Sequence, residues 1–210
     1  MPTILVISPH PDDESIGCGG SLRKHVVAGD PVHVVFLTSG EAGGHGRSPN
    51  DTRRVREDEA RKAAGVLGLT SVEFWQLPDG HVKAEPELIQ RLRAAVDRLK
   101  PAVVYVPHDA EMHPDHRAAV ELVAGAIEAM GTARPAVFMY EVWTPIQVID
   151  HVEDISDVMS HKLTALREYR TQCEVMRLDD AVQGLNRYRG VMHTWPGCGP
   201  YAEIFKRLVR

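Results

Sequence analysis

The chain has 210 residues, the size of a single domain with one sizeable core. Lys and Arg total 24 against 29 Asp and Glu, and the formal net charge of −5 argues against a sequence-independent nucleic-acid binder, which would carry a basic surface. The 43% hydrophobic and 25% charged residues exclude a disordered chain or a coiled coil, and no apolar stretch approaches the roughly 18–20 residues of a membrane span.

Short apolar runs alternate with helical patterns along the first two thirds of the chain. Strands are predicted at 4–8, 32–38, 72–77, 103–106 and 137–142. Helices are predicted at 21–28, after a glycine-rich turn, and at 51–67, 88–99, 115–130, 156–172 and 180–188. We therefore expect one α/β domain over residues 1–210, with a doubly wound, mostly parallel sheet, helices on both faces and an elaborated C-terminal part.

The cysteines and the N-terminus indicate the compartment. Cys18, Cys173 and Cys198 are an odd, scattered set with no C-x-x-C, which argues for a reducing environment. The first residues, MPTILVIS, lack a basic region and a cleavage site and are typical of a first strand. We expect a cytoplasmic protein.

Two similar motifs follow two of the predicted strands. The sequence HPDD begins at His10, after the strand at 4–8, and HPDH begins at His113, after the strand at 103–106. In a doubly wound sheet of the usual order 3-2-1-4, the first and fourth strands are neighbours, and functional residues gather at their carboxyl ends. The two motifs are therefore expected to meet in one crevice.

The residue types in these motifs are metal ligands and acid–base groups. Imidazole and carboxylate suit a borderline divalent metal such as Zn²⁺, and a catalytic zinc site usually takes three protein ligands. A remaining carboxylate suits a general base, and a remaining imidazole suits an acid held by a neighbouring Asp. Six residues share these roles: His10, Asp12, Asp13, His113, Asp115 and His116. One such cluster alone is more typical of a turn, but two after adjacent strands favour a metal site.

Other motifs of enzymes and nucleotide-binding proteins are absent from the sequence. There is no helical HExxH, no Walker A sequence and no GxSxG. The stretch GCGG from Gly17 fails the dinucleotide fingerprint because Leu22 stands where the third glycine belongs. A nucleotide-binding Rossmann protein is therefore disfavoured.

With these motifs the chain resembles the PIG-L/LmbE-like family of zinc-dependent N-acetylglucosaminyl deacetylases. Weaker supporting stretches follow in the family's order, namely Thr38–Glu41, Arg56-x-x-Glu59, Leu77–Gly80 and Tyr201–Phe205. The resemblance implies a Rossmann-like fold, one zinc ion per chain and hydrolysis of an acetamide on a small amino-sugar substrate.

The resemblance also implies roles for individual residues. It assigns metal ligation to His10, Asp13 and His116, general-base catalysis to Asp12, and oxyanion stabilisation to His113, with Asp115 orienting it and His193 as a further candidate. It implies substrate contacts for Arg56, with Glu41 and Asp79 in the supporting stretches. Some members carry a tyrosine where this chain has Glu111, which removes a tyrosine from the expected mechanism.

Two other functions remain open on the sequence. A metal-dependent amidase acting on a non-sugar amide would use the same motifs. A non-catalytic sugar-binding protein on the same fold is disfavoured by Asp12, which chemistry needs and ligation does not. The loops 41–50 and the region after Tyr140 are expected to set specificity, and the apolar stretch 137–149 suggests a homo-oligomer.

Overall fold

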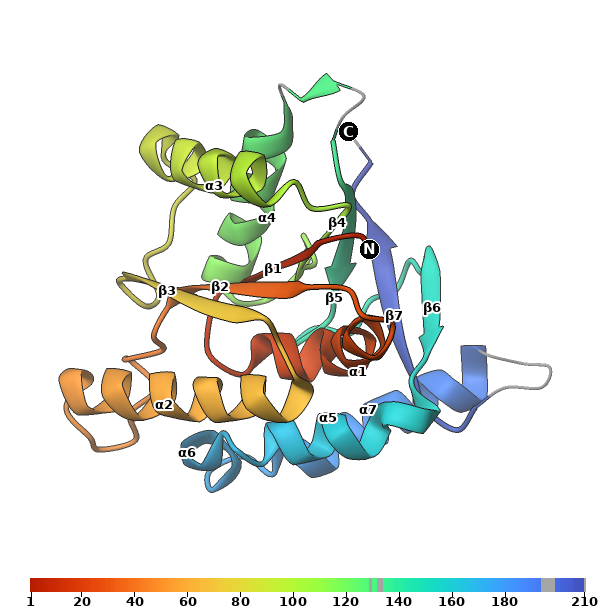
Figure 1. Ribbon diagram of the computed structural model, residues 1–210. Coiled ribbons are helices and arrows are strands. Elements are labelled where there is room, and N and C mark those ends of the chain that lie inside the picture. Colours follow the sequence, from red (N-terminus) through yellow and green to blue (C-terminus); the bar gives the residue numbers. More distant parts are fainter. Residues whose placement is uncertain (129, 132–133, 194–198, 210) are drawn as a thin grey trace.

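The computed structural model describes residues 1–128, 130–131, 134–193 and 199–209 (Figure 1). Within these ranges, a seven-stranded sheet has the order β3-β2-β1-β4-β5-β7-β6. Its strands are β1 (Ile4–Ser8), β2 (Val32–Thr38), β3 (Ser71–Leu77), β4 (Val103–Pro107), β5 (Ala136–Tyr140), β6 (His151–Asp154) and β7 (Ala202–Arg207). Strands β1 to β5 are parallel, whereas β7 runs antiparallel to both β5 and β6.

Helices cover both faces of the sheet (Figure 1). On one face lie α3 (Pro86–Leu99) and α4 (Pro114–Glu128). On the other lie α1 (Asp13–Val27), α2 (Pro49–Leu67), α5 (Met159–Leu166), α6 (Arg170–Cys173) and α7 (Leu178–His193). The predicted fold class, a doubly wound and mostly parallel sheet with helices on both faces, is confirmed.

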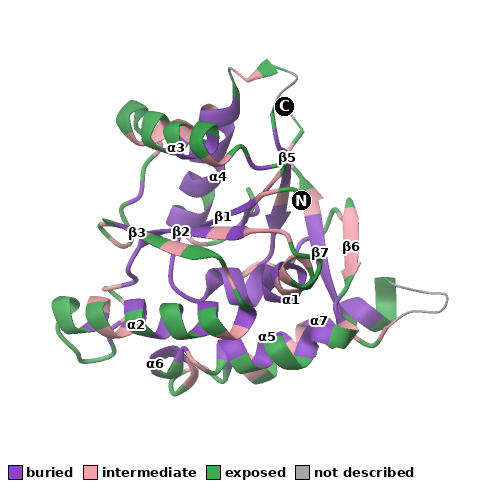
Figure 2. Ribbon diagram, viewed as in Figure 1, coloured by how far each residue is buried: buried purple, intermediate pink, exposed green. Residues whose placement is uncertain are grey.

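The central strands are buried on both faces because helices cover both (Figure 2). Leu5 and Ile7 of β1 pack on the core with α3 and α4, whereas Ile4 and Val6 pack on the core with α1 and α2. This explains why β1 reads as an unbroken apolar run. None of the helices in the described ranges combines the length and the apolar character needed to cross a membrane.

The glycine-rich stretch predicted as a turn lies inside helix α1, which begins at Asp13. Close packing explains the glycines. A Cβ atom on Gly17 would lie within 2.1 Å of the Tyr140 ring, and one on Gly20 within 2.7 Å of Ile155. The glycines therefore allow close helix packing where the sequence pattern suggested a turn.

The C-terminal third departs further from the prediction. The helix expected at 156–172 is broken into a 3₁₀ turn, η2 (Ser156–Val158), α5 and α6. The break lies at Tyr169, whose backbone is not helical (φ −77°, ψ 59°) and whose buried hydroxyl donates to Glu14 at 2.5 Å. Helix α7 is longer than the expected 180–188, and strands β6 and β7 were missed. A single domain over 1–210 stays a prediction.

The apolar stretch 137–149 has a use within the chain. Strand β5 lies between β4 and β7, and Val137, Met139 and Tyr140 are buried there. The stretch therefore does not require a second subunit, and the homo-oligomer stays a prediction. Cys18 is buried and Cys173 is half-buried, both free of disulfides, whereas Cys198 lies outside the described residues.

Candidate active site

The two motifs meet at the carboxyl ends of β1 and β4. These strands pair in parallel, with Ile4 opposite Val103, so both chains leave the sheet at the same edge. His10 Nδ1 lies 3.3 Å from His116 Nε2 although 106 residues separate them. The expectation that the motifs share one crevice is confirmed.

Three ligand atoms form a small triangle at this edge. Asp13 Oδ2 lies 3.1 Å from His10 Nδ1 and 3.2 Å from His116 Nε2, and the two nitrogens are 3.3 Å apart. Ligand atoms about 2.0–2.1 Å from one zinc ion at tetrahedral angles lie roughly 3.3–3.4 Å from one another. The three atoms therefore stand at the spacing that one small divalent metal requires.

The burial of these residues also fits a metal. His10 is 8% exposed, Asp13 1% and His116 0%. The nitrogens that face away from the triangle are buried as well: His10 Nε2 lies 3.0 Å from Asp79 Oδ1, and His116 Nδ1 has no hydrogen-bond partner in the described part of the chain. Ligand atoms also gather within 4.8 Å of one another in two further sets, His10 with His113 and His116, and His10 with Asp79 and Asp115. The donors suit a borderline cation such as Zn²⁺.

Opposite charges in the triangle shift the pKa of each member. Burial alone raises the pKa of Asp13, but His116 and His10 outweigh it and hold that pKa well below its usual range. Burial lowers the pKa of His116, yet the charge of Asp13 raises it overall to about 9. Contacts with Asp115 and Asp13 likewise overcome burial and raise the pKa of His10. Ligation of a metal must therefore displace protons from both rings.

Asp12 stands beside the triangle with an unusual backbone. Its φ of 124° is rare for a residue with a side chain and costs about 1–3 kcal/mol. Glu14 Oε2 accepts the Asp12 N–H at 3.2 Å, and Arg56 Nη2 lies 3.2 Å from Asp12 Oδ2. Burial raises the pKa of Asp12 to about 7, against the lowering effect of Arg56. A carboxylate with this pKa suits proton transfer near neutral pH.

Arg56, predicted to contact substrate, is 4% exposed and largely committed to the protein. It donates to the carbonyls of Gly40 at 2.9 Å and Pro11 at 2.6 Å as well as to Asp12. It lines the pocket described below. These contacts fix the walls of the cavity around Asp12.

His113 and Asp115 lie where expected, but their mutual contact differs from the expectation. His113 Nδ1 accepts the backbone N–H of Asp115 at 3.2 Å. The Asp115 carboxylate instead accepts the N–H groups of Gly80 at 2.8 Å and Val82 at 3.1 Å and faces His10 Nε2 at 3.4 Å. Burial, then His10 and His116, lower the pKa of His113. The backbone of Asp115, and not its side chain, orients the His113 ring.

The remaining predicted residues differ in their distance from the cluster. Asp79 reaches it, with Oδ1 at 3.0 Å from His10 Nε2. Glu41 lies behind Asp79 and accepts its N–H at 3.1 Å. His193 is exposed at the end of α7, with Nε2 at 3.4 Å from Arg189. No described contact joins His193 to the cluster, so its catalytic role stays a prediction.

A cavity of about 290 Å³ opens onto the triangle. It is lined by His10, Asp12, Asp13, Ala42, Gly43, His45, Arg56, Asp79, Gly80, His113, Trp143, Gln172 and Met176. Both regions expected to set specificity contribute, through His45 and Trp143. Gln172 and Met176 were missed, and no local signal could have found them, because long-range packing brings them to the cavity.

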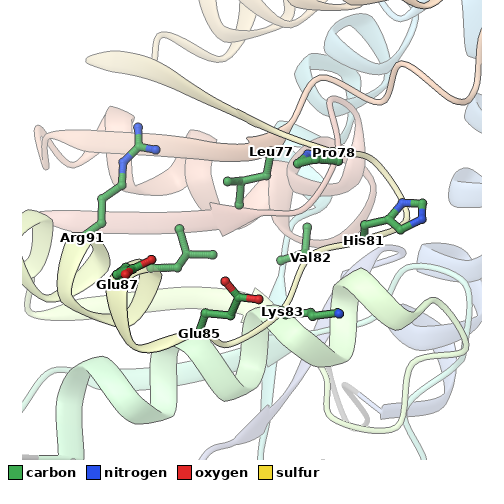
Figure 3. Close-up of a pocket in the computed structure, with 9 residues that line it drawn as sticks. Leu77, Pro78, His81, Val82, Lys83, Glu85, Glu87 and Arg91 are labelled. Carbon is green, nitrogen blue, oxygen red and sulfur yellow. The ribbon is translucent and has the colours of Figure 1, made fainter.

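A second cavity, of about 420 Å³, is lined by residues on either side of Asp79 and Gly80, among them Pro78 and His81 (Figure 3). Its lining comes partly from the segment around Gly80 and includes the apolar side chains of Leu77, Val82 and Leu88. Charged side chains of both signs stand around it, among them Lys83 and Glu85. None of the metal-ligand sets lies there, so the smaller cavity is the candidate active site.

Comparison with known proteins decides the family. The PIG-L family, described as GlcNAc-PI de-N-acetylase, matches residues 5–127, more than half of the chain. The chain belongs to the PIG-L family. The matched range contains both motifs, and the resemblance drawn from them is confirmed.

Similarity to relatives and solved structures extends over nearly the whole chain. The chain is 30% identical over 207 residues to a probable N-acetyl-alpha-D-glucosaminyl L-malate deacetylase 2 of Bacillus subtilis, covering 91% of this chain and 92% of that protein. The conserved protein TT1542 from Thermus thermophilus superposes with a TM-score of 0.86 at 32% identity, covering 100% and 95%. GalB, a 4-carboxy-2-hydroxymuconate hydratase from Pseudomonas putida, gives 0.86 at 25% identity, covering 100% and 97%.

Proposed function

We propose that this PIG-L protein is a zinc-dependent N-deacetylase that removes the acetyl group from an N-acetylglucosamine conjugate and releases acetate. The observation that carries the proposal is the triangle of His10, Asp13 and His116 with Asp12 beside it in one cavity. The name of the Bacillus subtilis relative, a deacetylase of an N-acetylglucosaminyl conjugate, supports the substrate class.

The three triangle residues would hold the metal. When bound, a divalent metal there would polarise the acetamide carbonyl and make a water molecule more acidic. Asp12 takes a proton from the attacking water, and its pKa of about 7 matches this task at neutral pH. Arg56 keeps the Asp12 carboxylate in place through its 3.2 Å contact. Water adds to the acetyl carbon, the proton held by Asp12 passes to the nitrogen, the C–N bond breaks, and the nitrogen leaves as the amine.

His113 is the proposed donor to the oxyanion. Because Nδ1 accepts the N–H of Asp115, a neutral His113 ring carries its proton on Nε2. The lowered pKa of His113 favours this neutral form. The ring lies close to the triangle, with its centroid 4.6 Å from that of His10. Asp79 and Arg56 are the proposed substrate contacts of the inner cavity, and Glu41 supports Asp79.

Acetate release tests the proposal directly. Zinc-loaded protein is incubated with a panel of N-acetylglucosamine conjugates, N-acetylated non-sugar amides and a buffer control, with and without a chelator. We expect acetate only from the sugar conjugates, and only while the metal is present. Acetate from the non-sugar amides alone would favour an amidase, and sugar binding without acetate would favour a binding protein. GalB, a hydratase, shows that this fold also serves a reaction other than deacetylation.

A further inference from the structure

Glu111 lies between a proposed metal ligand and the segment that follows β5. It is 1% exposed. Its Oε1 atom accepts three consecutive backbone N–H groups, from Val142 at 2.8 Å, Trp143 at 2.9 Å and Thr144 at 3.1 Å. Three donors on one oxygen fix the carboxylate in position and leave its second oxygen pointing elsewhere.

The second oxygen faces the ring of His116. Glu111 Oε2 lies 3.6 Å from His116 Nδ1, slightly beyond hydrogen-bond length. Both atoms are buried, and neither has a hydrogen-bond partner in the part of the chain that the structure describes. A buried donor and a buried acceptor without partners, set opposite each other, satisfy each other's requirement after a small movement.

The chemistry of a histidine ligand explains this arrangement. A neutral imidazole that gives the Nε2 lone pair to a metal carries its only proton on Nδ1. That N–H needs an acceptor, and metal-bound histidines in proteins almost always donate it to a carboxylate, a carbonyl or water. In His116, Nε2 faces Asp13 and His10, and Nδ1 faces Glu111.

We propose that Glu111 is a positioning residue that accepts the Nδ1–H of His116, so that Nε2 is presented to the metal. The proposal rests on the metal-dependent function argued above. Because the same carboxylate anchors Trp143, which lines the cavity, Glu111 also joins the metal ligand to the wall of the pocket. Glu111 would thus act on the metal ligand, at the position where some members of the resembled family carry a tyrosine.

Substitution of Glu111 by glutamine isolates the contact with His116. The amide oxygen can still accept the three backbone N–H groups, which places the NH₂ group opposite His116 Nδ1. That group can only donate, so it favours the ring form with its proton on Nε2, where the metal should bind. We expect Glu111→Gln to bind zinc about 10–100-fold more weakly, measured by competition with a chromophoric chelator.

Glu141 provides a matched control. It is a buried carboxylate next to the same segment, but it pairs with Arg189 at 2.8 Å and accepts the Ile146 N–H at 2.9 Å. Glu141→Gln should leave the zinc affinity within about twofold of the wild type. An unchanged affinity in Glu111→Gln would overturn the proposal, as would an equal loss in both variants. A wild type that binds no zinc would instead contradict the metal-dependent function itself.

Two further measurements separate positioning from general loosening. Hydrogen exchange of the Val142–Thr144 amides should change little in Glu111→Gln and rise strongly in Glu111→Ala. The second measurement uses the zinc-loaded wild type and so does not depend on the folding of a variant. In its ¹⁵N spectra, the ring proton of His116 should be on Nδ1 and protected from exchange. A proton on Nε2 would overturn the proposal.

Discussion

Helix α1 touches two clusters of buried charge that differ in how completely their atoms are paired. Near its middle, Glu203 accepts the N–H groups of Gly20 and Ser21, both at 2.8 Å, and the ammonium of Lys162 at 2.6 Å. At its start, the cluster around Asp13 leaves buried atoms such as His116 Nδ1 and Glu111 Oε2 without a hydrogen-bond partner in the described part of the chain.

The difference indicates that the Glu203 cluster stabilises the fold, whereas the cluster around Asp13 serves the proposed function. A buried charge whose hydrogen bonds are all made has no capacity left for a ligand, and the Glu203 cluster ties β7 and α5 to α1. A buried polar atom without a partner is costly unless something else satisfies it. In the cluster around Asp13, a metal on His116 Nε2 would fix the ring proton on Nδ1, where Glu111 can accept it. Both clusters include stretches that the family resemblance rests on.

The largest expected effect is in His116→Ala. Removing one corner of the triangle leaves two ligands, and we expect the purified variant to lose its metal and its acetate release while remaining folded. Metal analysis by mass spectrometry, alongside circular dichroism, gives both results. Undiminished metal occupancy would remove His116 from the ligand set. It would also contradict the functional role given to the cluster around Asp13.

Asp12→Asn should lower kcat about 10²–10⁴-fold, the usual contribution of a positioned base. Asn has nearly the shape of Asp and tolerates a positive φ, so folding and metal content should change little. Steady-state kinetics and metal analysis on the same preparation check both statements. If the variant loses its metal but regains activity with added zinc, then Asp12 is the ligand and Asp13 is the general base.

Lys162→Met tests the framework cluster. The substitution leaves the buried Glu203 carboxylate without its cation, which costs about 3–5 kcal/mol of unfolding free energy. Denaturant titration measures this cost, and the folded fraction should still bind one equivalent of zinc. A stable variant that has lost its metal would contradict the division between the two clusters.

The smallest expected effect is proton release on zinc binding. The pKa of His116 is raised to about 9, and contacts with Asp115 and Asp13 raise the pKa of His10 against the effect of burial, so we expect both rings to be protonated at pH 7 in chelator-stripped protein. Zinc should therefore release about two protons at pH 7 and fewer as the pH rises past about 9. Calorimetry in buffers of different ionisation enthalpy measures this number. Binding without proton release at pH 7 would show that the rings are neutral.

The same shifts fix the pH dependence of stability in the stripped protein. A folded-state pKa above the unfolded value stabilises only while the group stays protonated. The contribution of His116 is complete below about pH 6.5 and is lost as the pH rises through about 9. Thermal melts of stripped protein should show the midpoint falling over this range, and a rising midpoint would contradict the sign.

The sequence was sufficient for the features that local patterns determine. Apolar runs located β1 to β5, and the order of the first four strands brought His10 and His116 together. Features set by long-range contacts were not predictable. The pairing of β6 and β7 and the break at Tyr169 depend on partners far along the chain. The role of Glu111 needed the positions of both Trp143 and His116.

Diffraction from zinc-loaded crystals at the zinc absorption edge tests the central claim most directly. We expect one anomalous peak per chain, about 2.0–2.2 Å from His10 Nδ1, Asp13 Oδ2 and His116 Nε2. A peak held instead by His10, Asp79 and Asp115, the other set with a carboxylate at this edge, would contradict the assignment. So would crystals that bind no zinc at this edge of the sheet.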